Sequence, residues 1–220
     1  MRCVFATFNA GKVREVRDLL AGLPLDLVGP ADLGIEALAE ETGVTFRDNA
    51  ILKASDVFSR TGLPAFADDS GLEVAALGGR PGVYSARFAG EGHDDGANIR
   101  KLLGLLHGVD DRRARFVCHA VLVFEPEAIA FHGGLPEGVL RIDGHPLAPP
   151  GAGVIAAEGE VRGTIIDDPR GHDGFGYDPV FYREDLGRTF AQLGRDEKNA
   201  LSHRGQAFRR LRAAVERGLG

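Results

Sequence analysis

The feature that most constrains the fold is the run Ala-Arg-Phe-Val-Cys-His-Ala-Val-Leu-Val-Phe at residues 114–124. It is nearly continuous in apolar and β-branched residues, which is typical of a central strand buried on both faces. Such a strand needs partners and covering layers. Further apolar runs predict strands at 2–7 and 65–67. Apolar residues at helical spacing predict helices at 11–23, 45–61, 94–107 and 200–217.

The order of these elements indicates the fold class. Helices alternate with strands in the first half of the chain. Residues 127–168 hold several short strand-like pieces rich in Gly and Pro, which predict a meander of antiparallel strands in a second lobe. Pro149-Pro150 and Gly151-Ala152-Gly153 are expected to be turns there. The pattern predicts an α/β, three-layer fold with a central mixed sheet, in which residues 1–220 form a single domain with two lobes.

Composition excludes several classes of protein. The net charge of −6 disfavours a nucleic-acid partner, because backbone binders usually carry a basic surplus. No apolar run approaches the roughly 20 residues that span a bilayer, and no signal peptide is evident. The two cysteines, Cys3 and Cys118, lie in predicted strands and fit a reducing compartment. We therefore expect a cytoplasmic protein with no membrane partner.

The first candidate site is residues 7–12, Thr-Phe-Asn-Ala-Gly-Lys, between the first predicted strand and helix. A link of this kind can present backbone N–H groups to an anion. Gly11 would allow close backbone approach, and Lys12 adds a positive charge. Thr7 and Asn9 offer side-chain hydrogen bonds. The segment lacks the Walker A pattern, and the alternative is an ordinary turn with an asparagine cap.

Adjacent carboxylates, Asp68 and Asp69, follow the predicted strand at 65–67. Two neighbouring carboxylates at a strand end repel each other unless they are solvated or a cation neutralises them. Mg²⁺ is commonly held by one or two carboxylates plus substrate phosphates, and a carboxylate here could also deprotonate a water. The alternative is a solvated turn, since Asp-Asp-Ser-Gly is good turn chemistry.

A third group surrounds the start of the second predicted helix. Asn49 and Lys53 are four residues apart and share a helix face. Lys53 could contact a phosphate, and the preceding Glu41 could be a second metal carboxylate. The alternative is a solvated helix face with a capping acid.

Two later segments could bind a nucleoside. Residues 169–179 place glycines around two aromatic residues, which would let the backbone approach a flat ligand. Phe175 or Tyr177 could stack on a base, and Asp178 could accept a hydrogen bond from its edge. In residues 198–204, Asn199 and His203 are four residues apart, as are Lys198 and Ser202, and each pair could share a helix face. Ser202 is instead a possible cap of the last helix, followed by His203 and Arg204. Cationic groups would then lie in the first turn, beside the positive end of the helix dipole.

In this order, the motifs resemble the inosine triphosphate pyrophosphatase family, the dITP/XTP pyrophosphatases. The resemblance runs from about residue 3 to 215. Its matching segments are 7–12, 41–54, 67–72, 81–88, 174–179 and 202–204. The resemblance implies two lobes that flank a nucleotide cleft, and a homodimer. It also implies Mg²⁺-dependent hydrolysis of ITP, dITP and XTP to the monophosphate and pyrophosphate, which cleanses the nucleotide pool.

The same resemblance assigns roles by position. Asp69 would be the catalytic general base and a metal ligand, and Glu41 a second metal ligand. His203 and Arg204 would read the 6-keto edge of the purine, where hypoxanthine and xanthine carry an acceptor and adenine a donor. The donor to this edge would be Arg204 or a backbone N–H. The residues assigned to the substrate are Thr7, Phe8, Asn9, Ala10, Gly11, Lys12, Lys53, Ser70, Phe175, Gly176, Tyr177, Asp178, Lys198, His203 and Arg204.

Two alternatives stay open. One is a related enzyme that cleaves other nucleotides, such as modified pyrimidine triphosphates. The other is a non-catalytic nucleotide- or RNA-binding module that uses the arginine-rich last helix. The sequence also departs from the family: residues 126–155 are long and rich in Gly and Pro, and Gln192 stands where Glu is common.

Overall fold

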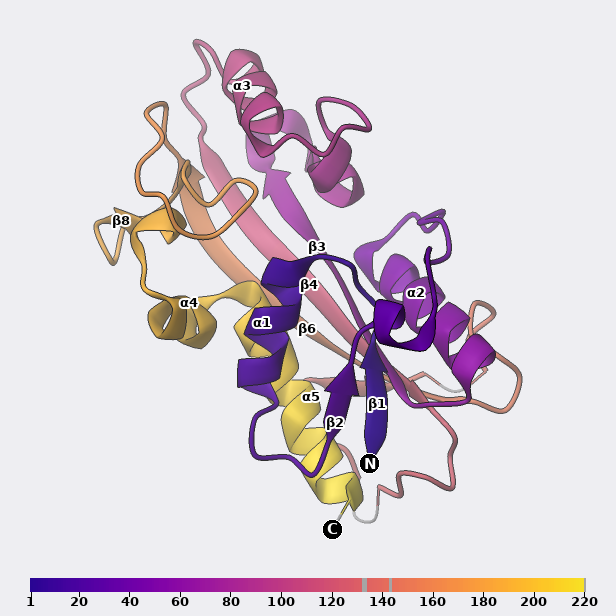
Figure 1. The fold of residues 1–220 in the computed structure, drawn as a ribbon. Helices are drawn as coiled ribbons and strands as arrows, with labels where there is room; N and C mark the ends of the chain where they lie inside the picture. The colour runs from indigo at the N-terminus through magenta and orange to yellow at the C-terminus, as the bar shows by residue number, and fades with distance from the viewer. Residues whose placement is uncertain (132–133, 143, 220) are drawn as a thin grey trace. The chain divides into compact units, whose positions relative to one another are not determined.

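The computed structural model describes residues 1–131, 134–142 and 144–219 (Figure 1). Its strands are β1 (Arg2–Phe5), β2 (Asp26–Val28), β3 (Ala65–Val74), β4 (Arg113–Phe124), β5 (Val139–Arg141), β6 (Gly153–Ile165), β7 (Phe181–Arg183) and β8 (Arg188–Thr189). Its α-helices are α1 (Ala10–Leu19), α2 (Phe46–Thr61), α3 (Asp95–Leu105), α4 (Arg195–Leu201) and α5 (His203–Leu219). Short 3₁₀ turns are η1 (Pro30–Leu33), η2 (Ala75–Leu77), η3 (Gly82–Arg87) and η4 (Phe190–Gln192).

The strands form one mixed sheet in the order β2-β1-β3-β4-β6-β7-β8, with β5 paired to β6. β1 runs parallel to both β2 and β3. The pairs β5–β6, β6–β7 and β7–β8 are antiparallel. The predicted mixed α/β sheet, with antiparallel pairing in the second half of the chain, is confirmed.

The chain divides into two compact units. Unit 1 comprises Met1–Asp69, Cys118–Gly159 and Arg204–Gly220, and unit 2 comprises Ser70–Val117 and Glu160–His203. β3, β4 and β6 each contribute residues to both units. No helix within the described ranges is long and apolar enough to cross a membrane.

In unit 1, helices cover both faces of the sheet. One apolar cluster joins α1 and α5 to alternate strand residues such as Phe5 and Phe66, and the ring of Phe5 meets that of Phe208 at 5.7 Å. The other joins α2 to the intervening strand residues, among them Val4 and Ala67. Because successive strand side chains point to opposite faces, one strand supplies both layers.

The core of unit 2 is rich in aromatic rings. Phe116 lies 4.5 Å from Phe181 and 5.9 Å from Phe190, measured between ring centroids. Leu102 of α3 packs in the same cluster. The Asp94 side chain caps α3 by accepting a hydrogen bond from the Ala97 N–H.

Helix α2 forms where the sequence predicts it, because its end signals are local. The Thr45 hydroxyl accepts a hydrogen bond from the Asp48 N–H at 3.1 Å, as an N-cap does. Gly62 ends the helix with φ of 67°, which is the left-handed conformation that glycine adopts without strain.

Two predictions about element boundaries were wrong. The strand predicted at 65–67 continues as β3 to Val74, so Asp68 and Asp69 lie within a strand and not in a turn after it. Burial on both faces outweighs the turn preference of Asp-Asp-Ser-Gly. The helix predicted at 200–217 is two helices, because Ser202 has extended backbone between α4 and α5. His203 and Arg204 therefore do lie in the first turn of a helix, as one interpretation predicted.

The meander of short strands predicted at 127–168 was wrong in part within the described residues; 132–133 and 143 lie outside them. The short strand β5 does pair antiparallel with β6, but β6 itself is not short. One long strand, β6, fills 153–165. Its glycines mark close packing, since a Cβ at Gly153 would lie 2.7 Å from the Phe124 ring. A Cβ at Gly163 would lie 2.6 Å from the Tyr182 carbonyl oxygen. Some of the residues predicted to form turns do so, such as Gly151 with φ of 83°, whereas Gly153 begins β6.

Candidate active site

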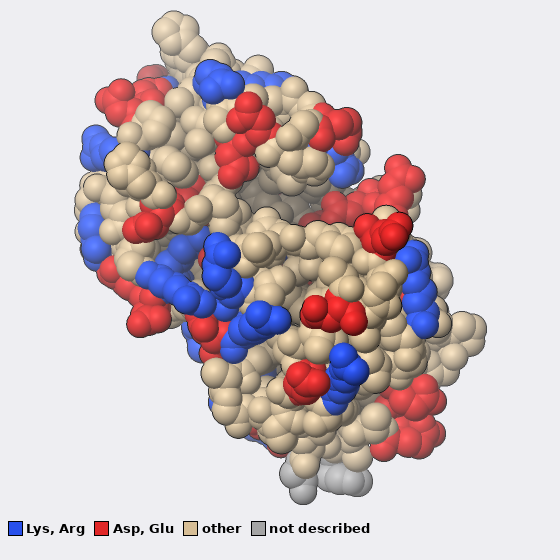
Figure 2. All heavy atoms as spheres, in the orientation of Figure 1, with Lys and Arg blue, Asp and Glu red and all other residues tan. Residues whose placement is uncertain are grey.

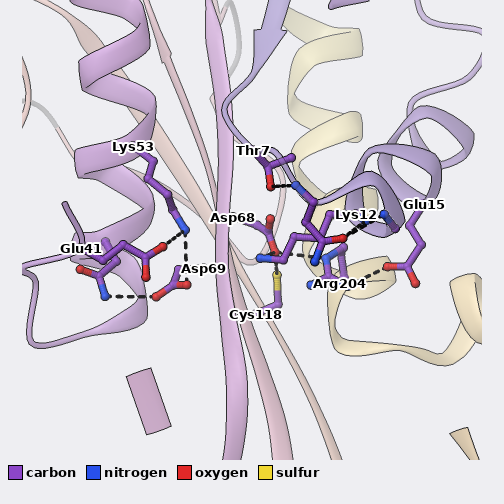
Figure 3. Close-up of polar contacts among 12 residues, drawn as sticks. Thr7, Lys12, Glu15, Glu41, Lys53, Asp68, Asp69, Cys118 and Arg204 are labelled. Carbon is purple, nitrogen blue, oxygen red and sulfur yellow. Dashed lines mark hydrogen bonds and ion pairs between the residues drawn. The ribbon is translucent and has the colours of Figure 1, made fainter. Parts of the chain in front are cut away.

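β3 directs its two carboxylates to opposite faces of the sheet. Asp68 is 1% exposed and Asp69 is 6% exposed, and their side chains point apart (Figure 3). Asp68 faces the layer of α1 and α5, whereas Asp69 faces α2. Each carboxylate therefore has its own set of partners, all within unit 1.

Asp68 lies between two cations. Its Oδ2 is 3.1 Å from the Lys12 Nζ and accepts a hydrogen bond from the Arg204 Nε at 3.1 Å. Arg204 also donates through Nη1 to Glu15 Oε2 at 2.7 Å. The Cys118 thiol donates to the same Asp68 oxygen at 3.8 Å. Burial alone would raise the pKa of Asp68, but Lys12 and Arg204 outweigh it and hold that pKa well below its usual range.

Asp69 shares one cation with a second carboxylate. The Lys53 Nζ lies 2.6 Å from Glu41 Oε1 and 3.4 Å from Asp69 Oδ1 (Figure 3). The Asn49 Nδ2 donates to Asp69 Oδ2 at 3.2 Å. Burial raises the pKa of Asp69 above its usual value; Glu41 adds to this rise, and Lys53 opposes it. A carboxylate with a raised pKa is suited to accept a proton near neutral pH.

Lys53 stays charged despite its burial. Burial alone would lower its pKa, but Asp69 and Glu41 outweigh burial and raise it. The structure thus brings three predicted site residues, Glu41, Lys53 and Asp69, into one cluster. Lys12 lies on the other face of β3, where it contacts Asp68.

Residues 7–12 form a capped turn. The Asn9 Oδ1 accepts hydrogen bonds from the N–H groups of Gly11 at 2.9 Å and Lys12 at 3.1 Å. Thr7 Oγ1 accepts from the Asn9 N–H at 3.2 Å. These two helix N–H groups are therefore occupied by the asparagine cap, the alternative that the sequence left open. The Phe8 ring is 51% exposed and contributes little to the core.

In unit 2, residues 174–178 form a loop that Asp178 stabilises. Its Oδ2 accepts from the Phe175 N–H at 2.9 Å and from the Lys198 Nζ at 2.7 Å. The same Nζ lies 4.6 Å from the centre of the Phe175 ring. Tyr177 is buried and donates its hydroxyl to the Ser85 carbonyl at 2.9 Å. Of the two aromatic residues predicted to stack on a base, Phe175 is therefore the more accessible.

The remaining predicted residues lie in different settings. Ser70 is partly exposed in β3. The N–H of Gly176 donates to Asp95 Oδ2 at 2.7 Å. The buried ring of His203 stacks on Phe116, with ring centroids 4.8 Å apart.

Two side chains of this cluster, Glu41 and Asp69, could hold a metal ion. The described part of the chain holds no cluster of three or more His, Cys, Asp or Glu side chains that could bind a metal. Glu41 and Asp69 nevertheless contact one cationic group, Lys53, and offer only oxygen ligands. Mg²⁺ typically takes one or two carboxylates and completes its shell with water and phosphate oxygens. The carboxylates of Glu41 and Asp69 therefore fit Mg²⁺.

Several residues that contact the predicted site residues on either face of β3 were not themselves predicted. Asn49 was noticed only for its spacing from Lys53. Glu15 gave no signal, because an acid in a helix is ordinary. The pairing of Asp68 with Arg204 joins positions 136 residues apart, which no local pattern reveals.

Known proteins resemble this chain over its whole length. A model described as the Ham1 family matches residues 3–143 and 145–214. The dITP/XTP pyrophosphatase of Shigella flexneri is 46% identical over 224 residues, covering 99% of each chain. That of Yersinia pestis is 46% identical over 219 residues, covering 97% of this chain and 98% of the relative.

A solved HAM1 protein from Coxiella burnetii matches the structure with a TM-score of 0.80 at 38% identity, over 98% of each chain. The resemblance that the ordered motifs indicated is thus confirmed by a family model, by relatives and by a solved structure. The chain belongs to the Ham1 family.

Proposed function

We propose that this protein is a nucleoside-triphosphate pyrophosphatase that hydrolyses dITP, XTP and ITP to the monophosphate and pyrophosphate. Full-length relatives at 46% identity carry the name dITP/XTP pyrophosphatase. The single observation that carries the proposal is the cluster on one face of β3. There, the Asp69 carboxylate lies beside Lys53, which also contacts Glu41, and accepts a hydrogen bond from Asn49.

Asp69 is the proposed general base. Its carboxylate would take a proton from the attacking water. Lys53 would supply positive charge to the phosphates once its contacts with Glu41 and Asp69 loosen. Lys12 would do the same from the residue 7–12 turn. The family resemblance also assigns Lys198 to the phosphates, and its contact with Asp178 would have to be exchanged for that role.

Magnesium is the proposed cofactor, held by Glu41 and Asp69. When bound, it would neutralise charge that develops on the phosphate oxygens. The protein's own contribution is to place two carboxylate side chains so that both contact one cationic group, which the distances to Lys53 support.

Nucleoside recognition is assigned to Phe175, Gly176, His203 and Arg204. A donor directed at position 6 would accept hypoxanthine and xanthine and would oppose the amino group of adenine, at a cost of about 1–3 kcal/mol per unsatisfied group. Arg204 already donates to Asp68 and Glu15, so a contact with the purine would compete with these carboxylates. The three-layer arrangement with two lobes flanking a nucleotide cleft stays a prediction, as do the homodimer and the cytoplasmic location.

The RNA-binding alternative has little support. The net charge is −6, and acidic side chains lie among the basic ones on the face drawn in Figure 2. That face is not the uniformly basic surface that binds a nucleic-acid backbone.

A substrate panel tests the proposal. We expect ITP, dITP and XTP to give monophosphate and pyrophosphate in the presence of Mg²⁺, with much slower turnover of ATP. Faster turnover of dTTP or UTP would favour the pyrimidine alternative, and no turnover of any nucleotide would refute the proposed function.

A further inference from the structure

Asn49 is a buried amide that joins the two carboxylate-bearing segments of the cluster. It is 1% exposed. Its Oδ1 accepts a hydrogen bond from the Gly43 N–H at 2.7 Å, and its Nδ2 donates to Asp69 Oδ2 at 3.2 Å. Gly43 lies two residues after Glu41. One side chain therefore contacts both Asp69 and the segment that carries Glu41.

The orientation of this amide is determined by its partners. A backbone N–H can only donate, so the atom that faces Gly43 must be the amide oxygen. The amide nitrogen is then directed at Asp69. Asp69 is consequently held through both oxygens, since Lys53 contacts its Oδ1 at 3.4 Å and Asn49 its Oδ2.

We infer that Asn49 is a positioning residue, which fixes the Asp69 carboxylate relative to the Glu41 segment so that the two act on one cation. The inference rests on the proposed function. Hydrogen-bond partners of metal-binding carboxylates typically change metal affinity or activity by about 10–100-fold when they are removed.

Gly43 offers a second way to disturb the same contact. A Cβ at this position would lie 2.6 Å from the Asn49 Oδ1, 2.8 Å from the Asp48 Cβ and 2.9 Å from the Asn49 backbone nitrogen. Its φ lies outside the left-handed region, so alanine is allowed by the backbone. Gly43→Ala should therefore separate the Asn49 amide from the segment that carries Glu41, while leaving the chemistry of the amide intact.

Matched controls exist in unit 2. Asn98 is 2% exposed, accepts from the Ala89 N–H at 2.7 Å and donates to the Ala86 carbonyl at 3.0 Å. Asn98→Ala thus removes a comparably buried and hydrogen-bonded amide. Gly92→Ala adds a Cβ with nothing within 4 Å.

The test measures three quantities on the full chain: kcat and KM for dITP, the dissociation constant for Mn²⁺ alone, and the urea midpoint. We expect Asn49→Ala and Gly43→Ala to lower kcat by about 10–100-fold, with KM changed less than about three-fold, and to weaken Mn²⁺ binding by about ten-fold. The variants Asn98→Ala and Gly92→Ala should keep kcat and Mn²⁺ affinity within about three-fold of the wild type.

Two results would overturn the inference. One is wild-type kcat and Mn²⁺ affinity in Asn49→Ala, or in Gly43→Ala if the first variant does not fold. The other is an equal loss in Asn98→Ala, which would assign the effect to stability. A wild type with no nucleotide turnover would refute the proposed function alone, because the Mn²⁺ comparison still decides the role of Asn49.

Discussion

Replacing each of the two adjacent aspartates by asparagine should affect different properties: Asp68→Asn should lower the free energy of unfolding, and Asp69→Asn should lower turnover. In Asp68→Asn, Lys12 and Arg204 face a neutral amide where each had a carboxylate oxygen at 3.1 Å. Breaking a buried ion pair from one side typically costs about 3–5 kcal/mol, because it leaves uncompensated charge behind. Arg204 keeps Glu15 at 2.7 Å, so the expected cost lies towards the lower end of that range.

Asp69→Asn should leave stability within about 1 kcal/mol of the wild type. The raised pKa of Asp69 means that the folded chain disfavours its charge, and the amide removes this penalty. Lys53 keeps Glu41 at 2.6 Å. The same variant should lose turnover by several orders of magnitude, because it has no base. A folded, stable and inactive protein is the expected result.

The assay is urea unfolding followed by far-UV circular dichroism, since the chain has no tryptophan. With an m-value of about 2–3 kcal/mol/M, Asp68→Asn should lower the midpoint by about 1–2 M at pH 7. Asp111→Asn is the control, because Asp111 pairs with Arg113 at 2.8 Å at an exposed site and should change the midpoint little. A lower urea midpoint for Asp69→Asn than for Asp68→Asn would refute the reasoning.

The pH dependence of the free energy of unfolding gives a second measure of the contribution of the Asp68 ion pairs. The pKa of Asp68 is lowered in the folded protein. Its contribution to stability is therefore fully present above the pKa of the unfolded chain, about 3.9, and is lost as the pH falls towards the folded value. The difference between wild type and Asp68→Asn should narrow below about pH 4. A difference that stays constant down to pH 3 would contradict the ion-pair explanation.

Three further predictions concern the cation and the base. EDTA should abolish turnover and Mg²⁺ should restore it; activity that persists in EDTA would remove the metal from the proposal. Lys53→Met should bind free Mn²⁺ at least about ten-fold more tightly by calorimetry, because the Lys53 ammonium competes for the same carboxylates, Glu41 and Asp69. Phe175→Ala should raise KM for dITP about ten-fold with a smaller change in kcat, since base stacking contributes about 1–3 kcal/mol; an unchanged KM would mean that the ring does not contact the base.

Elements with local end signals were predictable, and elements that depend on distant partners were not. Thr45 caps the start of α2 and Gly62 caps its end, both through contacts within a few residues. The first and last residues of α2 could therefore be predicted from the sequence. The extent of β3 could not, because the strand is stabilised by layers on both faces. The glycines of β6 suggested turns, but Gly153 and Gly163 lie where neighbouring groups approach too closely for a side chain.

The residues of the candidate site could likewise be predicted from the sequence, but their tertiary contacts could not. Glu41, Lys53 and Asp69 were selected by residue type and order, and the structure brings them together. Their distances could not be predicted, nor could the partners of Arg204, because these contacts depend on tertiary packing. Asn49 was visible in the sequence as a neighbour of Lys53 on a helix face, but its role depends on Gly43 and Asp69, which only the fold places beside it.

The strand conformation at Asp68 and Asp69 is what allows the two carboxylates to differ. In a solvated turn, both would be hydrated and would keep ordinary pKa values. In a strand, the side chains point to opposite faces and meet different charges. Asp68 meets two cations, and its pKa falls; Asp69 shares one cation with Glu41, and its pKa rises. Titratable groups whose environments drive their pKa values apart are candidates for different acid and base roles. Asp68 thus joins α1 and α5 to the sheet through Lys12 and Arg204, and Asp69 on the opposite face remains the proposed base.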